Sequence, residues 1–283
     1  MKLLRVGKVG EEKPAVLDDN GLIRDLSDHI SEIDTEFLGN NGFEKVAKLD
    51  LDSLPVIDEN ERIGQPISHV GKFICVGLNY ADHAAESGME VPSEPVLFMK
   101  ATSSVMGPND TVYMPPKSEK SDWEVELGVI IGKEAKYVTE ENALDHVAGY
   151  CVINDLSERE YQIEKQGQWC KGKGCDTFGP IGPYLVTAAE VEDSNQLGIW
   201  LELNGKRVQN GNTNTMVYKV PYLVHYISQF MSLQPGDIIS TGTPPGVGFG
   251  MSPPAYLKEG DVMRLGIDGM GEQQQIVAST VID

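Results

Sequence analysis

The strongest constraint on the fold of this chain is a pair of carboxylates at the start of an apolar run. Glu124 and Glu126 lead into residues 127–131, whose sequence LGVII is typical of a buried strand. Side chains alternate between faces along a strand, so the two carboxylates point the same way. Two adjacent anions repel each other and resist desolvation unless their face is wet or a cation lies between them. The pair therefore predicts either a solvated surface on an edge strand or a site for a divalent metal.

A third carboxylate favours the metal. Asp155 follows a second apolar strand, residues 150–153, at the point where the chain turns polar and a helix is expected to begin. One possible role of Asp155 is therefore to cap the N-terminus of that helix. If the two strands pair, however, three carboxylates converge at one end of a sheet. Three hard oxygen ligands with open coordination positions suit Mg²⁺, Mn²⁺ or Ca²⁺.

A histidine and a glutamate lie three residues apart in the segment that follows residues 72–77, another expected strand. On a short helix His83 and Glu86 would be neighbours, so Glu86 could orient His83 as a general base. A surface histidine beside an acid is the alternative. The spacing therefore indicates a contact, and the catalytic role needs further support.

Two glycine-rich segments could approach a ligand closely. Lys173 lies between two glycines, where the backbone can pass near a bound molecule, although a plain surface turn has the same pattern. Thr243 belongs to a segment of glycines and hydroxyls after a strand, which could bind a carboxylate or phosphate. This segment lacks the Gly-Lys-Ser/Thr ending of a P-loop, which disfavours nucleotide binding.

Charge and cysteine content limit the classes of partner. The chain has 23 Lys and Arg against 43 Asp and Glu, a net charge of -20, which disfavours nucleic acid and anionic membranes as partners. An anionic small molecule stays compatible, because a bound cation can reverse the field inside one pocket. The four cysteines are sparse and irregularly spaced, as in a reducing compartment. With no long apolar run, the sequence predicts a soluble, cytoplasmic protein.

The pattern of strands predicts an α+β, β-rich fold in two parts. Residues 1–68 hold short β-like pieces and acidic helical stretches, and we place a domain boundary there. Residues 69–283 are dominated by strands with many Gly and Pro between them. The clearest helix should begin at Pro221 and run to Met231, before Pro235 and Gly236 stop it.

In combination, these motifs resemble the fumarylacetoacetate hydrolase family. The resemblance covers about residues 70 to 280 and is closest to bacterial members with a small N-terminal domain, including acylpyruvate and 2,4-diketo-3-deoxy sugar acid hydrolases. In chain order the matching segments are NYADH (79–83), PVLFMK (95–100), EVEL (124–127), NDLSER (154–159), GKGCDT (172–177) and TGTP (241–244).

The resemblance implies a mixed β-roll catalytic domain behind a small N-terminal α/β domain, usually in a homodimer. It implies a divalent metal, Mg²⁺ or else Mn²⁺ or Ca²⁺, and leaves open whether Asp82 adds a ligand. By position in the family motifs, the implied roles are metal ligand for Glu124, Glu126 and Asp155, general-base dyad for His83 and Glu86, active-site lysine for Lys173, and substrate contact for Tyr80, Lys100, Arg159, Gln162 and Thr243.

The reaction implied by the resemblance is hydrolysis of the C3–C4 bond of a 2,4-dioxo acid, which releases pyruvate. The partner would then be a small anionic 2-oxo acid. Decarboxylation of an oxaloacetate-like acid, or isomerisation or hydration of an unsaturated 2-oxo acid, are alternatives that the fold alone does not separate. A binding protein that has lost the chemistry is a further alternative.

Overall fold

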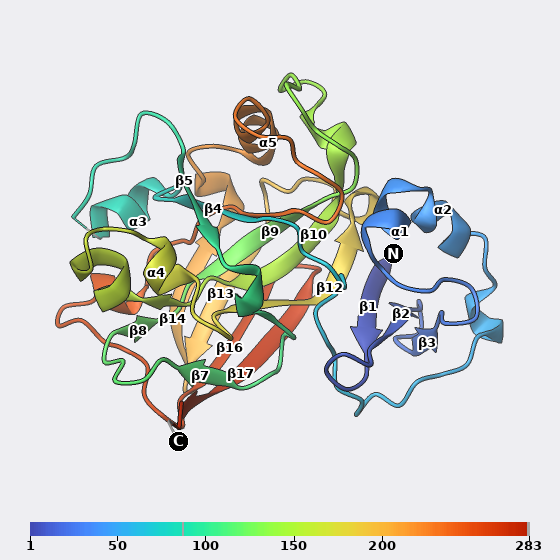
Figure 1. Cartoon of the computed structure of the whole chain (residues 1–283), viewed down its shortest axis with the longest axis horizontal. Coiled ribbons are helices and arrows are strands. Elements are labelled where there is room, and N and C mark those ends of the chain that lie inside the picture. The colour runs from blue at the N-terminus through green and yellow to red at the C-terminus, as the bar shows by residue number, and fades with distance from the viewer. Residues whose placement is uncertain (87, 282–283) are drawn as a thin grey trace.

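A ten-stranded mixed sheet crosses the molecule in the computed structural model, which describes residues 1–86 and 88–281 (Figure 1). A short strand, β6 (Val105–Met106), pairs with β12 beside the main path. Along that path the strands are, in order, β3 (Ile23–Asp25), β2 (Lys13–Leu17), β1 (Lys2–Val6), β12 (Gly179–Thr187), β10 (Val147–Asn154), β9 (Val125–Ile131), β15 (Ile238–Ser240), β4 (Phe73–Gly77) and β5 (Val96–Lys100).

A five-stranded sheet packs on this large sheet and closes the main core. Leu127 and Val129 of the large sheet share one hydrophobic cluster with Leu201 and Leu265 of the smaller one. The five strands, in sheet order, are β14 (Lys206–Asn212), β13 (Gly198–Leu203), β16 (Val262–Ile267), β17 (Gly271–Ser279) and β7 (Val112–Met114), and a separate ladder joins β8 (Ser121–Asp122) to β11 (Ser157–Glu158). The expected β-rich α+β fold is confirmed.

The helices are short and lie around the sheets (Figure 1). None in the described residues is long and apolar enough to cross a membrane. They are α1 (Thr35–Gly39), α2 (Gly42–Val46), α3 (Ala81–Glu86), α4 (Cys170–Lys173) and α5 (Val220–Ser228), with single turns η1 (Leu51–Ser53), η2 (Thr102–Ser104), η3 (Ala143–His146), η4 (Glu160–Glu164), η5 (Ala188–Glu190), η6 (Thr213–Thr215) and η7 (Gly248–Gly250).

Of two predicted helices, one is shorter than expected and the other is wrong. Pro221 lies in the first turn of α5, as expected, but the helix ends at Ser228, before Met231. A helix directly after Asp155 is wrong, because strand β11 comes first and the next helical turn starts at Glu160. Asp155 is therefore not a helix cap.

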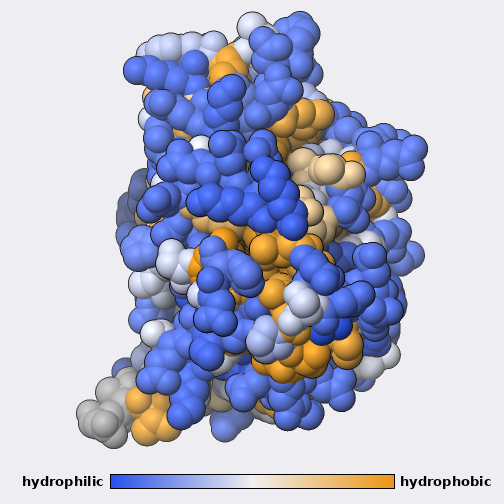
Figure 2. All heavy atoms as spheres, turned by 90° about the vertical axis from the view of Figure 1, so that its right-hand side faces the viewer, coloured by the Kyte–Doolittle hydropathy of each residue, from blue (hydrophilic) through white to orange (hydrophobic). Residues whose placement is uncertain are grey.

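The N-terminal segment extends the large sheet. Strand β1 pairs with β12 in antiparallel register, Leu3 opposite Leu185, and Leu3 shares a second core cluster with Ile130 and Ile153. The division at residue 68 and the homodimer stay predictions. On this side of the molecule the surface is mostly hydrophilic, with hydrophobic side chains gathered towards its centre and lower half (Figure 2).

Candidate metal centre and active site

Strand pairing brings the three predicted carboxylates together. Strand β9 pairs with β10 so that Glu126 lies opposite Ile153, and the amide of Asp155 donates to the carbonyl of Glu124 at 2.8 Å. One oxygen of each carboxylate lies within 4.8 Å of the others, and all three residues are buried. Because β9 is flanked by β10 and β15, the alternative of a solvated edge is wrong. The expected convergence of carboxylates is confirmed.

Basic side chains balance most of this charge. Lys173 Nζ lies 2.5 Å from Glu124 Oε2 and 2.8 Å from Asp155 Oδ2, while Lys100 Nζ lies 2.6 Å from Asp155 Oδ1. Arg159 Nη2 donates to Glu124 Oε1 at 2.6 Å. Burial on its own would raise the pKa of Glu124, but the charges of Lys173 and Arg159 outweigh it and lower the pKa to about 2. Glu124 is therefore a carboxylate at neutral pH.

Glu126 has a different environment. No basic side chain pairs with it among the described residues, and its Oε2 accepts from Ser240 Oγ at 2.6 Å and the Gly242 amide at 2.8 Å. Burial, followed by the charges of Asp155 and Glu124, raises the pKa of Glu126 to about 8. The ionised form of Glu126 therefore has no positive partner of its own unless a cation binds.

The residues present fit a divalent cation. The cluster contains four acids, Asp122, Glu124, Glu126 and Asp155, against three bases, Lys100, Arg159 and Lys173. Its formal charge with all acids ionised is one negative unit, so a divalent cation leaves one positive unit for an anionic substrate. Each oxygen of Glu124 and Asp155 accepts one hydrogen bond and keeps a second lone pair, and Glu126 keeps Oε1 for a ligand bond. Such hard oxygens suit Mg²⁺, Mn²⁺ or Ca²⁺.

Metal affinity should fall as the pH falls below about 8, because Glu126 must lose its proton to become a ligand. Its pKa is raised, so the protonated form accumulates on the acid side, and each pH unit costs up to about tenfold in affinity. Titration calorimetry with Mn²⁺ between about pH 6 and 8 measures this dependence. An affinity that stays constant over this range contradicts the assignment of Glu126.

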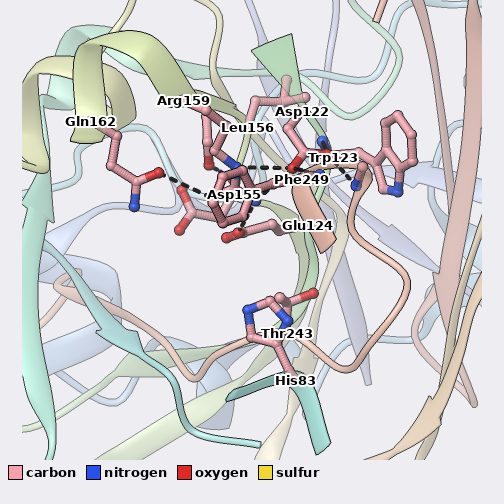
Figure 3. Close-up of polar contacts among 12 residues, drawn as sticks. His83, Asp122, Trp123, Glu124, Asp155, Leu156, Arg159, Gln162, Thr243 and Phe249 are labelled. Atoms are coloured by element: carbon pink, nitrogen blue, oxygen red, sulfur yellow. Dashed lines mark hydrogen bonds and ion pairs between the residues drawn. The ribbon is translucent and has the colours of Figure 1, made fainter. Parts of the chain in front are cut away.

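The histidine and glutamate predicted as a dyad are adjacent on α3. His83 Nδ1 lies 3.6 Å from Glu86 Oε2, and the Gly246 amide donates to both oxygens of Glu86 at 2.9 and 3.1 Å. His83 is buried and lines the same cavity as Glu124 and Glu126, which measures about 140 Å³, and lies across it from Glu124 (Figure 3). The separation suits a pair that tightens into a hydrogen bond when a ligand binds.

The predicted substrate contacts divide into two groups. Arg159, Gln162 and Thr243 line the cavity, with Arg159 Nη1 donating to Gln162 Oε1 at 3.0 Å (Figure 3). Lys100 lies behind the cavity wall against Asp155, and Tyr80 is fully buried with no partner for its hydroxyl among the described residues. Contact of either residue with substrate stays a prediction.

Asp82 lies apart from the carboxylate cluster. Its side chain is exposed, and Oδ1 accepts from the His83 amide at 3.0 Å. This places Asp82 at the first turn of α3, where a carboxylate accepts a backbone amide. A fourth ligand from Asp82 has no support in this arrangement.

Sequence reasoning missed Asp122. This buried carboxylate accepts from the amides of Trp123, Gly248 and Phe249, and from Nε and Nη2 of Arg159 at 2.9 and 2.7 Å. It therefore joins the arginine of the site to the segment containing Phe249 (Figure 3). The signal was present, because Asp122 continues the two-residue spacing of Glu124 and Glu126.

Asp122→Asn should destabilise the protein by about 1 to 3 kcal/mol, because it removes one of the two carboxylates that pair with buried Arg159. Urea unfolding measures the effect. Glu164→Gln is a matched control, since Glu164 pairs with Lys120 on the surface and should cost less than about 1 kcal/mol. Equal effects of the two substitutions would contradict the role of Asp122.

A β-rich fold that gathers buried carboxylates and a histidine–glutamate pair around one cavity defines an enzyme acting on small molecules. A family model described as fumarylacetoacetate (FAA) hydrolase C-terminal matches residues 72–278. The chain belongs to the fumarylacetoacetate hydrolase family, whose enzymes are hydrolases and isomerases. The resemblance found in the sequence is thereby confirmed.

Similar proteins align with this chain over nearly its whole length. A Burkholderia cenocepacia protein, named only as a hydrolase, is 59% identical over 97% of this chain and 98% of its own. Among solved structures, fumarylacetoacetate hydrolase from Exiguobacterium antarcticum is 36% identical, with a TM-score of 0.89 over 99% of this chain and 100% of its own.

Two further solved structures are of proteins named as different kinds of enzyme, a hydrolase and an isomerase. Maleylpyruvate hydrolase from Sphingobium, in complex with manganese and pyruvate, is 28% identical, with a TM-score of 0.83 over 99% of this chain and 100% of its own. The 2-hydroxyhepta-2,4-diene-1,7-dioate isomerase of Mycobacterium marinum is 30% identical, with a TM-score of 0.78 over the full length of both chains.

Proposed function

We propose that this protein is a metal-dependent hydrolase that cleaves the C3–C4 bond of a 2,4-dioxo acid and releases pyruvate. One observation carries the proposal: three buried carboxylates, from Glu124, Glu126 and Asp155, cluster beside a cavity that Glu124, Glu126 and His83 line, and His83 has Glu86 next to it. The maleylpyruvate hydrolase that this chain resembles holds manganese and pyruvate, which supports the same kind of site.

The carboxylates of Glu124, Glu126 and Asp155 would hold the metal, with Mg²⁺ the first candidate and Mn²⁺ or Ca²⁺ as alternatives. A bound divalent cation supplies Lewis acidity towards a 2-oxo carboxylate and the negative charge that develops from it. The carboxylates otherwise depend on Lys173, Lys100 and Arg159 to stay ionised in a buried site.

His83 would act as the general base. It takes a proton from a water molecule, whose oxygen then bonds to C4, and Glu86 steadies the resulting imidazolium. The C3–C4 bond breaks, its electron pair passes to the pyruvate fragment as an enolate, and the proton that His83 took from water passes to C3 to complete pyruvate. The other product is the carboxylic acid that contains C4.

Lys173 would act as a fixed positive charge. Burial alone would lower its pKa, but the charges of Asp155 and Glu124 outweigh this effect and raise the pKa above the ordinary lysine value. The ammonium therefore stays protonated and can stabilise the enolate by charge. Gln162 lines the same cavity beside Arg159, and its Nε2 would donate to the carboxylate end of the substrate while its Oε1 accepts from Arg159.

Isomerisation is the second candidate, since a solved structure of similar length is named as an isomerase of an unsaturated acid. A panel of 2,4-dioxo acids, oxaloacetate and unsaturated 2-oxo acids, assayed with Mg²⁺ or Mn²⁺, separates the reactions. We expect pyruvate from the dioxo acids. A change of ultraviolet absorbance without pyruvate, seen with the unsaturated acids alone, would favour the isomerase instead.

A further inference from the structure

Polar and apolar side chains share the lining of the cavity. The polar part includes Glu124, Glu126, His83 and Lys173, which the proposed head group of the substrate would use. The apolar part, called the apolar wall below, consists of Val76, Leu78, Met89, Phe98, Ile163 and Trp169. The two parts adjoin, because Lys173 Nζ lies 5.1 Å from the centroid of the Phe98 ring. The head group accounts for the polar part alone, so the apolar wall needs an occupant of its own.

Packing holds part of this wall in place. The rings of Phe98 and Trp169 meet edge to face with centroids 5.2 Å apart. Trp169 also lies directly on the end of strand β4, where a Cβ on Gly77 would come within 2.5 Å of the indole. Only glycine allows this close approach. The indole is thus fixed beside the cavity by the backbone that precedes Leu78.

Leu78 itself has an unusual backbone. Its φ is +55°, a left-handed conformation that is costly for a branched side chain. The side chain of the next residue holds the turn. Asn79 Nδ2 donates to the carbonyls of Tyr218 and Thr241 at 3.0 and 2.7 Å, and Asn79 Oδ1 accepts from the backbone amide of Tyr218 at 2.8 Å. Glycine or asparagine would adopt this conformation more easily, so a leucine here indicates use of its side chain.

The apolar wall has no basic side chain that could pair with a second acidic group. Among the described lining residues, Arg159 and Lys173 are the only ones with a permanent positive charge, and both already pair with Glu124. A carboxylate at the far end of a substrate would lose its water without gaining a partner. A tail with several hydroxyls would also lose water against Leu78 and Phe98, whose side chains carry no polar group.

We infer that the substrate carries an uncharged, apolar tail, an aliphatic or aromatic acyl group, which lies on the wall formed by Leu78, Phe98 and Trp169. This rests on the proposed function for the 2-oxo acid head. It separates an acylpyruvate-type substrate from dicarboxylates and from sugar acids.

Binding of acids that lack the 4-oxo group tests the tail without any cleavage. With Mn²⁺ present, 2-oxooctanoate should bind about tenfold or more tightly than pyruvate, since each methylene removed from water contributes roughly fourfold. The diacid 2-oxooctanedioate should bind no more tightly than pyruvate. Titration calorimetry measures all three. A diacid that binds as tightly as 2-oxooctanoate overturns the inference.

Two substitutions locate the tail. Leu78→Asn suits the left-handed backbone and should keep the melting temperature, while it removes the preference for 2-oxooctanoate over pyruvate. Leu78→Met retains an apolar side chain and should keep that preference. An unchanged preference in Leu78→Asn overturns the placement of the tail. If the preference holds while no dioxo acid is cleaved, the proposed hydrolysis fails and the inference about the tail stands.

Discussion

Glu126→Gln is expected to abolish metal-dependent turnover while the metal-free protein keeps its fold. Glu126 is the one carboxylate of the cluster with no basic partner among the described residues, so its replacement leaves no buried cation unpaired. Glutamine can still accept from Ser240 and Gly242. Since a metal ion contributes several kcal/mol to catalysis, kcat should fall by about a thousandfold or more.

The unfolding free energy separates this effect from misfolding. The pKa of Glu126 is raised from 4.5 to about 8, so the native protein holds a proton that the unfolded chain has already lost, and stability falls as the pH rises between these two values. Glu126→Gln removes this loss and should be at least as stable as the parent in alkaline buffer without metal. Glu124→Ala and Asp155→Ala should also abolish turnover, but they leave basic side chains unpaired and lower stability. Normal turnover in Glu126→Gln would contradict its role as a ligand.

His83→Ala is expected to lose hydrolysis and to keep metal binding. The imidazole lines the cavity across from Glu124 and is not one of the three clustered groups, so Mn²⁺ affinity should change little. Loss of a general base lowers kcat by about 10² to 10⁴. Pyruvate release and Mn²⁺ titration on the same preparation measure the two effects.

Asp82→Asn is a matched control, since Asp82 is exposed on the same helix and lies outside the cluster. Its turnover should stay within a fewfold of the parent. Full hydrolytic activity in His83→Ala would exclude the base assignment. Retained decarboxylation of oxaloacetate together with lost hydrolysis would indicate a reaction that needs no attacking water.

The local parts of the fold were predictable from the sequence. Strand β16 has the expected bounds, and β9 begins one residue after the expected start, because alternation and β-branched residues define a strand over a few positions. The convergence of Glu126 and Asp155 followed from assuming that two neighbouring strands pair. The helix after Asp155 was wrong because a polar turn signal is common to helices and to short bridges such as β11.

Contacts between distant segments were not predictable. Lys100 contacts Asp155, 55 residues further along the chain, and β1 pairs with β12, more than 180 residues further along. Neither contact produces a periodic pattern in a single sequence. The pairing of Arg159 with Asp122 belongs to the same class. The family motifs identified Lys100 and Arg159 as important, and the structure shows that both support carboxylates of the site.

Pyruvate release from an acylpyruvate with an apolar tail, measured on chelated protein before and after addition of Mg²⁺ or Mn²⁺, is the most direct test. The cluster of Glu124, Glu126 and Asp155 predicts no release after chelation, recovery with either ion, and no recovery in Glu126→Gln. Equal release with and without chelator, or recovery in Glu126→Gln, would contradict a reaction that depends on this metal centre.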